Sequence, residues 1–253
     1  MNVLIFDTET TSLDKPFCYD LGYTILDIES DEVLCSRHFI IEQVWHNLPL
    51  FQSAYYADKR PEYVALMRAH RAQLVKWGQA TQQMARDIKA FNITDTYAYN
   101  STFDTKVFDY CCDWFKTINP LDNVGIHDIW GYASQFITGK NDYRAFCEEH
   151  ELFTQTGNYS GSAETVYRFI TKDPEFVEKH MGLYDSQIEA RILMYCLTMG
   201  AALNTDYKVN TILKRPQEKD FTIKVNGAII LQGKYIRKWC KNDTYNFTTV
   251  SGD

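Results

Sequence analysis

The sequence predicts an α/β protein in which a mixed β-sheet is flanked by helices and followed by a small β-rich appendage at the carboxyl end. Residues 3–6 form a continuous apolar run, which is typical of a strand buried on both faces of a central sheet. After this run β-rich stretches come first and helical stretches dominate later, with alternation between them. Near the carboxyl end, Asn226-Gly227 separates two apolar runs, which is a strong hairpin signal.

The elements that follow the first strand can be predicted in order. Residues 19–27 and 33–41 are rich in β-formers around a polar connector, which predicts a hairpin beside the first strand. Residues 60–91, including Leu74, have helix formers with apolar residues at helical spacing. We expect Gly78 to separate two helices within this stretch.

Strands and helices alternate in the second half of the chain. A short aromatic strand is expected at 95–99, a helix at 103–115 and another strand at 124–129. The remaining helices are predicted at 129–137, 142–150, 162–171 and 183–202.

Charge is distributed unevenly and suggests two domains, a main domain at 1–204 and a basic β-hairpin appendage at 205–253. The net charge is −7, yet the appendage has nine Lys or Arg against five Asp or Glu. An acidic body with a basic appendage suits a protein that handles phosphodiesters. Basic and aromatic residues interleave there, as expected either for a single-strand platform or for a hairpin whose rings pack on the body: Lys234, Tyr235, Arg237, Lys238, Trp239 and Lys241.

Composition narrows the class of protein. With 45% hydrophobic and 23% charged residues, the chain is expected to fold rather than remain disordered. No apolar stretch approaches the roughly 20 residues of a membrane helix, and the amino terminus carries no export signal. The seven cysteines include no C-x-x-C pair, and the six histidines have no zinc-ligand spacing. We therefore expect a cytoplasmic protein without membrane contact.

Four acids and one histidine point to a metal site. Asp7 and Glu9 end the first strand and, two residues apart, share one face of it. Asp104 follows a later strand, and His180 and Asp185 lie at the start of the final helix. Hard divalent ions such as magnesium and manganese prefer carboxylate oxygens. The pattern predicts a site for such ions.

The acids also have local explanations. Ser101-x-x-Asp104 is typical of a capping box, and Asp185 is favourable in the first turn of a helix. In one uninterrupted helix, His180 and Asp185 would point about 140° apart. Because Gly182 weakens a helix, we expect a break that leaves His180 in the preceding loop and Asp185 on the first turn.

Taken in order, three motifs resemble those of the DEDD superfamily of 3′-to-5′ exonucleases, in its histidine-containing (DEDDh) branch, the group of proofreading-type exonucleases and ribonuclease T. FDTETTSL resembles the first motif, with Ser12 where glycine is common, and NSTFD resembles the second. The spacing from His180 to Asp185 resembles the third. The motifs span most of the chain but not the appendage. This resemblance implies a ribonuclease H-like fold.

The resemblance also implies two divalent ions, Mg or Mn, and a role for each residue. Asp7 would bridge both ions, and Glu9 and Asp185 would complete the shell of one. Asp104 would support the other ion. His180 would accept a proton from the attacking water, a role that suits its near-neutral intrinsic pKa.

Four further residues resemble family positions near the terminal nucleotide. Leu13 and Phe103 either contact a base or pack in the core. Asn100 either contacts substrate or shapes the turn. Thr10, in the first motif, is the fourth substrate-binding candidate.

The expected function is two-metal-dependent 3′-to-5′ hydrolysis of single-stranded nucleic acid to nucleoside 5′-monophosphates, with DNA preferred. One alternative is an RNA-trimming or oligoribonucleotide exonuclease, because discrimination depends on the 2′-hydroxyl. The other is a nucleic-acid-binding or polymerase-associated module of the same fold without turnover. The expected partners are 3′ ends of single-stranded DNA or RNA, and proofreading would need a separate polymerase or other replication partner chain.

Overall fold

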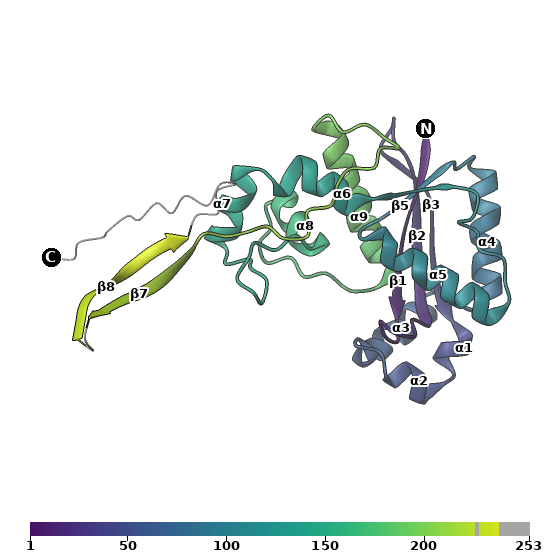
Figure 1. Cartoon of the computed structure of the whole chain (residues 1–253). Coiled ribbons are helices and arrows are strands. Elements are labelled where there is room, and N and C mark those ends of the chain that lie inside the picture. The colour runs from purple at the N-terminus through teal and green to yellow at the C-terminus, as the bar shows by residue number, and fades with distance from the viewer. Residues whose placement is uncertain (226–227, 238–253) are drawn as a thin grey trace.

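The computed structural model describes residues 1–225 and 228–237. Its centre is a six-stranded mixed sheet in the order β4-β3-β2-β1-β5-β6 (Figure 1). β2 runs antiparallel to β1 and β3, and the other neighbouring pairs are parallel. The strands are β1 (Asn2–Thr10), β2 (Cys18–Asp27), β3 (Glu32–Ile41), β4 (Gln73–Val75), β5 (Asp95–Ala98) and β6 (Gly125–Asp128).

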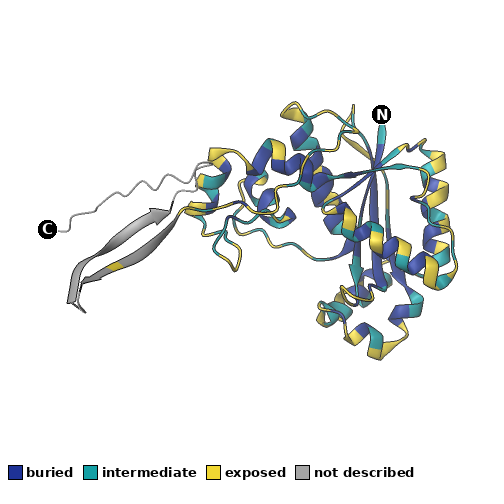
Figure 2. Cartoon of the chain, viewed as in Figure 1, coloured by how far each residue is buried: buried dark blue, intermediate teal, exposed yellow. Residues whose placement is uncertain are grey.

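Helices cover both faces of this sheet, as the sequence predicts. The α4 and α5 face packs on Leu4 and Phe6 of β1, and the α6, α8 and α9 face packs on Val3 and Ile5. β1 and β2 are consequently buried along most of their length (Figure 2). The helices on these faces are α4 (Trp77–Ala90), α5 (Ser101–Phe115), α6 (Ile129–Ala133), α8 (Ala163–Thr171) and α9 (Gly182–Thr198).

A lobe of short helices covers the end of the sheet where β1 ends and β2 begins (Figure 1). Its rings pack on Tyr19 of β2, with Phe51 at 5.1 Å and Tyr63 at 5.9 Å between ring centroids. We call residues 42–68 the helical lobe. It contains α1 (Glu42–Trp45), α2 (Leu48–Gln52), η1 (Ala57–Lys59) and α3 (Arg60–Arg68).

One prediction about this region is wrong. Gly78 does not separate two helices but lies in the first turn of α4. Instead, Leu74 belongs to β4, which pairs with Phe39–Ile41 of β3 at the edge of the sheet. The chain leaves α3 through His70, whose φ of 55° ends the helical path, and the apolar pair at 74–75 then extends the sheet.

The other predicted elements of the main domain are found with small shifts of their ends. The helix expected at 129–137 is α6 followed by the π-helical η2 (Ser134–Thr138), and α7 (Asn141–Glu149) follows. No described helix is long and apolar enough to span a bilayer. Six cysteines are described, and all six are free.

The α9 helix begins on the backbone of β2. A Cβ added at Gly22 would lie 1.8 Å from the backbone nitrogen of Leu183, and one added at Gly182 would lie 2.5 Å from the nitrogen of Gly22. Two glycines are therefore needed where the helix meets the strand. This contact fixes the start of α9 against the sheet.

The carboxyl-terminal segment first runs along the body and then forms the predicted hairpin. The backbone nitrogen of Tyr159 donates to the Leu213 carbonyl at 3.0 Å, and Arg215 pairs with Glu148 at 2.8 Å. β7 (Gln217–Val225) and β8 (Ala228–Arg237) then pair antiparallel and project from the body (Figure 1). The division into two domains at residue 204 stays a prediction. The interpretation of the basic and aromatic residues as a platform for single-stranded nucleic acid also stays a prediction. The turn at 226–227 and Lys238, Trp239 and Lys241 lie outside the described residues.

Candidate active site

The four acids expected to hold metal come together at the end of β1 under the helical lobe. We call Asp7, Glu9, Asp104 and Asp185 the acid cluster. Asp7 and Glu9 lie on β1, and charge repulsion from Asp104, Asp185 and Glu9 helps to raise the pKa of Asp7. Segments almost 180 residues apart in the sequence thus meet at one place.

Asp104 is fixed by the strand that carries the first two acids. Its Oδ1 accepts hydrogen bonds from the Thr8 nitrogen at 3.0 Å and the Thr8 hydroxyl at 2.7 Å. α5 begins at Ser101 with Asn100 as its N-cap, and the Asn100 side chain makes no cap hydrogen bond, so the capping-box explanation of Asp104 is wrong. Asp104 is only 2% exposed, and it joins α5 to β1.

Asp185 and His180 are placed as the predicted helix break requires. α9 begins at Gly182, which leaves His180 in the preceding loop with a φ of 47° and Asp185 in the first turn. One oxygen of Asp185 accepts the Met181 N–H at 2.8 Å, so Asp185 does cap the helix. Donor atoms of His180, Asp185 and Glu9 nevertheless lie within 4.8 Å of one another.

Two buried oxygens of the cluster have no hydrogen-bond partner among the described residues. They are Oδ2 of Asp7 and Oδ1 of Asp185. Buried carboxylate oxygens are normally paired, because desolvation without a partner is costly. These unpaired oxygens and the donor set of carboxylates and one imidazole fit a hard divalent cation.

The pKa values of the cluster reflect burial and mutual repulsion. Burial raises the pKa of Glu9 to about 8, with the Asp20 charge adding to it and Lys59 opposing it. Burial also raises the pKa of Asp185 to about 9, and that of Asp104 to about 7 despite the opposing Thr8 hydrogen bonds. A cation would favour the ionised forms and reverse these shifts.

The substrate-binding candidates lie on the two segments next to the cluster. Thr10 ends β1, and Leu13 in the following loop is 85% exposed, so core packing is the wrong explanation for Leu13. Asn100 is exposed with a left-handed φ of 65°, and its backbone N–H donates to Asp128 at 2.9 Å. Phe103 is partly buried against the core.

Sequence reasoning missed four charged residues at this site. One of them is Glu178, whose Oε2 lies 3.8 Å from Nδ1 of His180. Asp20 lies opposite Glu9 in the β1–β2 register and accepts the Gly182 N–H at 3.0 Å. Glu189, one turn after Asp185, is buried and accepts the Tyr99 N–H at 3.0 Å. Asp20 could have been found as an acid inside the apolar run of β2. Glu189 could have been found as an acid four residues after Asp185, on the same face of the helix. Lys59 had no such signal, because only the fold brings it near Glu9.

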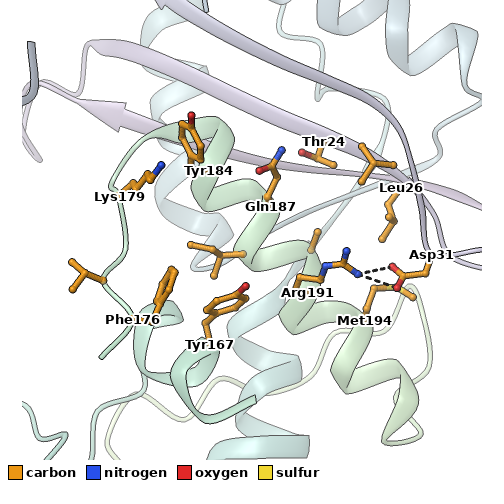
Figure 3. A pocket seen from close by; sticks show the side chains of 14 residues that line it. Thr24, Leu26, Asp31, Tyr167, Phe176, Lys179, Tyr184, Gln187, Arg191 and Met194 are labelled. Carbon is orange, nitrogen blue, oxygen red and sulfur yellow. Dashed lines mark hydrogen bonds and ion pairs between the residues drawn. The ribbon is translucent and has the colours of Figure 1, made fainter. Parts of the chain in front are cut away.

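A separate cavity of about 330 Å³ lies between the β2–β3 hairpin and the α8–α9 face (Figure 3). Its wall is mainly apolar, with an Arg191–Asp31 ion pair of 2.9 Å toward one end and Lys179 and Tyr184 toward the other. No member of the acid cluster lines it. The cavity therefore lies beside the segment that leads to His180 and is not the predicted metal site.

No family model and no curated protein matches the chain. Solved structures do. A 3′-exonuclease that recognises the 3′ end of a histone mRNA stem-loop shares 12% identity and a TM-score of 0.55, over 90% of this chain and 89% of that chain. The chain therefore has the fold of this 3′-exonuclease. The ribonuclease H-like α/β sheet expected from the motifs is thereby confirmed.

Exonuclease I also has a similar fold, but the similarity covers a smaller part of that enzyme's length. The enzyme from Methylocaldum szegediense shares 15% identity and a TM-score of 0.51, over 76% of this chain and 39% of that chain. A zinc-bound complex of E. coli Exonuclease I with single-stranded DNA shares 15% identity and a TM-score of 0.50, over 79% of this chain and 41% of that chain. This chain thus matches less than half of the length of Exonuclease I.

Proposed function

We propose that this protein is a divalent-metal-dependent 3′-to-5′ exonuclease that hydrolyses single-stranded nucleic acid to nucleoside 5′-monophosphates. The observation that carries the proposal is the convergence of four acids and His180 at the end of β1, where two buried oxygens have no hydrogen-bond partner among the described residues. The likeness of the fold to 3′-exonucleases supports both polarity and substrate class.

The acid cluster (Asp7, Glu9, Asp104 and Asp185) would hold two divalent ions, Mg or Mn. Such ions, when bound, neutralise the phosphodiester charge and assist attack by water. Thr8 keeps Asp104 oriented through its two hydrogen bonds. Asp20 holds the start of α9 and thereby the position of Asp185.

His180 would accept the proton of the attacking water. Burial, followed by the nearby Lys59 charge, lowers the pKa of His180 below its ordinary value. The imidazole is then neutral at pH 7 and has a nitrogen free to take up a proton. Its position within 4.8 Å of Glu9 and Asp185 donor atoms supports this role.

Leu13 and Phe103 are proposed to contact the terminal nucleotide, with Thr10 and Asn100 binding its polar groups. The exposure of Leu13 supports such contact, since an exposed apolar side chain can stack or wedge against a base. DNA is the preferred polymer in this proposal, supported by the likeness to Exonuclease I, one of whose structures contains single-stranded DNA. RNA is the alternative, which the likeness to a histone mRNA 3′-exonuclease favours.

The proposal is tested with DNA and RNA strands of one sequence, labelled at either the 5′ or the 3′ end. With Mg²⁺ or Mn²⁺, a 5′ label should give a ladder that shortens from the 3′ end, and a 3′ label should appear first as a mononucleotide. DNA should shorten faster than RNA. Binding without metal-dependent shortening would establish the non-enzymatic module instead.

A further inference from the structure

The imidazole of His180 lies flat against an aromatic ring from a distant part of the chain. Tyr56 and His180 have ring centroids 4.3 Å apart and planes inclined by only 10°. Tyr56 directly precedes η1 in the helical lobe and is partly buried. Burial, with the charges of Glu9 and Asp185 contributing, raises the pKa of Tyr56 to about 12, as expected for a phenol next to the acid cluster.

The helical lobe also holds the backbone immediately before His180. The Lys59 ammonium donates a hydrogen bond to the Lys179 carbonyl, and it lies 4.5 Å from the centroid of the Tyr56 ring. The Lys179 ammonium in turn lies 4.0 Å from the centroid of Tyr184 on α9, at one end of the cavity in Figure 3. The residue before His180 is thus held on one side by the lobe and on the other by the helix that carries Asp185.

His180 needs such support because of its backbone conformation. A φ of 47° is disfavoured for a residue with a Cβ and persists only where the surroundings hold it. The tight contact of Gly182 with Gly22 fixes the chain two residues later. Between these fixed points, the His180 imidazole lies flat on the ring of Tyr56, and its Nδ1 is 3.8 Å from Oε2 of Glu178.

We propose that Tyr56 is a positioning residue that holds the His180 imidazole toward the acid cluster, while Lys59 fixes the backbone that precedes it. This inference rests on the proposed function, in which His180 is the proton acceptor. Stacked aromatic pairs contribute enough to change the occupancy of one side-chain orientation about three- to tenfold. Losing the ring should therefore slow turnover without weakening substrate or metal binding.

The test compares Tyr56→Leu with Tyr56→Phe, which keeps the ring, and with Tyr55→Leu as a matched control. Tyr55 is adjacent and 88% exposed, and its ring meets the Tyr56 ring edge-on with centroids 4.8 Å apart, but no described contact joins it to His180. Tyr55→Leu therefore controls for the loss of a neighbouring ring that does not touch the imidazole. Tyr56→Leu should lower kcat about three- to tenfold with KM and Mn²⁺ affinity within about twofold of wild type. Tyr56→Phe should restore most of kcat, and Tyr55→Leu should match wild type.

A second readout does not depend on activity. Stacking on Tyr56 should shift the His180 ring protons upfield in the NMR spectrum, with the signals assigned by comparison with His180→Gln. The shift should be lost in Tyr56→Leu and kept in Tyr56→Phe. Lys59→Met, which removes the donor to Lys179 but keeps Tyr56, should also lower kcat and provides a second variant if Tyr56→Leu does not fold.

The inference is overturned if the ring-proton shifts are equal in wild type and Tyr56→Leu, or if kcat is unchanged in both Tyr56→Leu and Lys59→Met. If the proposed function itself is wrong, the experiments give a different result. In that case the wild-type chain shortens no strand, and the NMR arm alone decides whether Tyr56 orients His180.

Discussion

Folding raises the pKa values of individual carboxyl groups at the site, so the folded state becomes less stable as the pH rises. Carboxyl groups of an unfolded chain have pKa values of about 4, whereas folding raises those of Glu9 to about 8 and of Asp185 to about 9. The folded chain therefore keeps protons that the unfolded chain has lost. Stability that is fully present below about pH 4 is lost progressively as the pH rises to about 9.

The upward direction of these pKa shifts predicts how the stability of the metal-free protein varies with pH. In EDTA, the Tm should be at least about 5 °C lower at pH 8.5 than at pH 6, and Mn²⁺ should raise Tm more at pH 8.5, because binding releases fewer protons there. Thermal unfolding by circular dichroism measures both effects. Asp185→Asn should flatten the pH dependence, and Asp113→Asn, whose side chain is 84% exposed, should leave it intact. A Tm in EDTA that rises with pH over this range would contradict the assignment.

Single residues also show how far the sequence could predict the site. Asp7, Glu9, Asp104, His180 and Asp185 could be named in advance because their order and spacing along the chain carry the pattern. Tyr56 and Lys59 could not, since their relation to His180 exists only after residues some 120 positions apart have packed together. Local periodicity contains no information about such contacts.

At the scale of elements, the junction of α9 with β2 decides whether the site forms. Gly22 and Gly182 allow the helix backbone to touch the strand, and Asp20 accepts the Gly182 N–H. The sequence predicted the break at Gly182 because His180 and Asp185 would point about 140° apart in one helix and because glycine weakens a helix. It could not reveal that Gly22 lies beneath it, because that contact joins residues far apart in the chain.

Gly22→Ala tests this junction. Its Cβ would lie 1.8 Å from the Leu183 backbone, so α9 must shift. We expect a loss of stability of about 1–3 kcal/mol, or more, and a Tm lower by several degrees. Mn²⁺ binding should weaken because Asp185 moves with the helix. Gly139→Ala is the matched control, since its Cβ would meet nothing nearer than 3.4 Å. Equal Tm and Mn²⁺ affinity in the two variants would show that the contact is not needed.

The edge of the sheet shows where element prediction failed. Residues 73–75 were expected in a helix because Leu74 fits the apolar spacing of the preceding turns. They form β4 because β3 offers an unpaired edge on which the short segment can pair. Tertiary pairing overrides local propensity most readily in such short segments.

At the scale of the whole molecule, the sheet serves to bring acids from three distant segments to one end, beneath the helical lobe (Figure 1). β1 contributes two acids, α5 contributes one through Thr8, and α9 contributes one through its contact with β2. The four acids thus arrive on three rigid elements. The arrangement explains why the cluster survives its own repulsion and why a cation would stabilise it.

The most direct test of this account is calorimetric titration of the metal-free protein with Mn²⁺ near pH 7.5. Wild type should bind Mn²⁺ saturably, and Asp7→Asn should bind at least about tenfold more weakly, because it loses the carboxylate at the centre of the cluster. Asp113→Asn should bind as wild type does. Absence of Mn²⁺ binding to wild type, or equal affinity in Asp7→Asn, would contradict the central claim that these acids form a divalent-metal site.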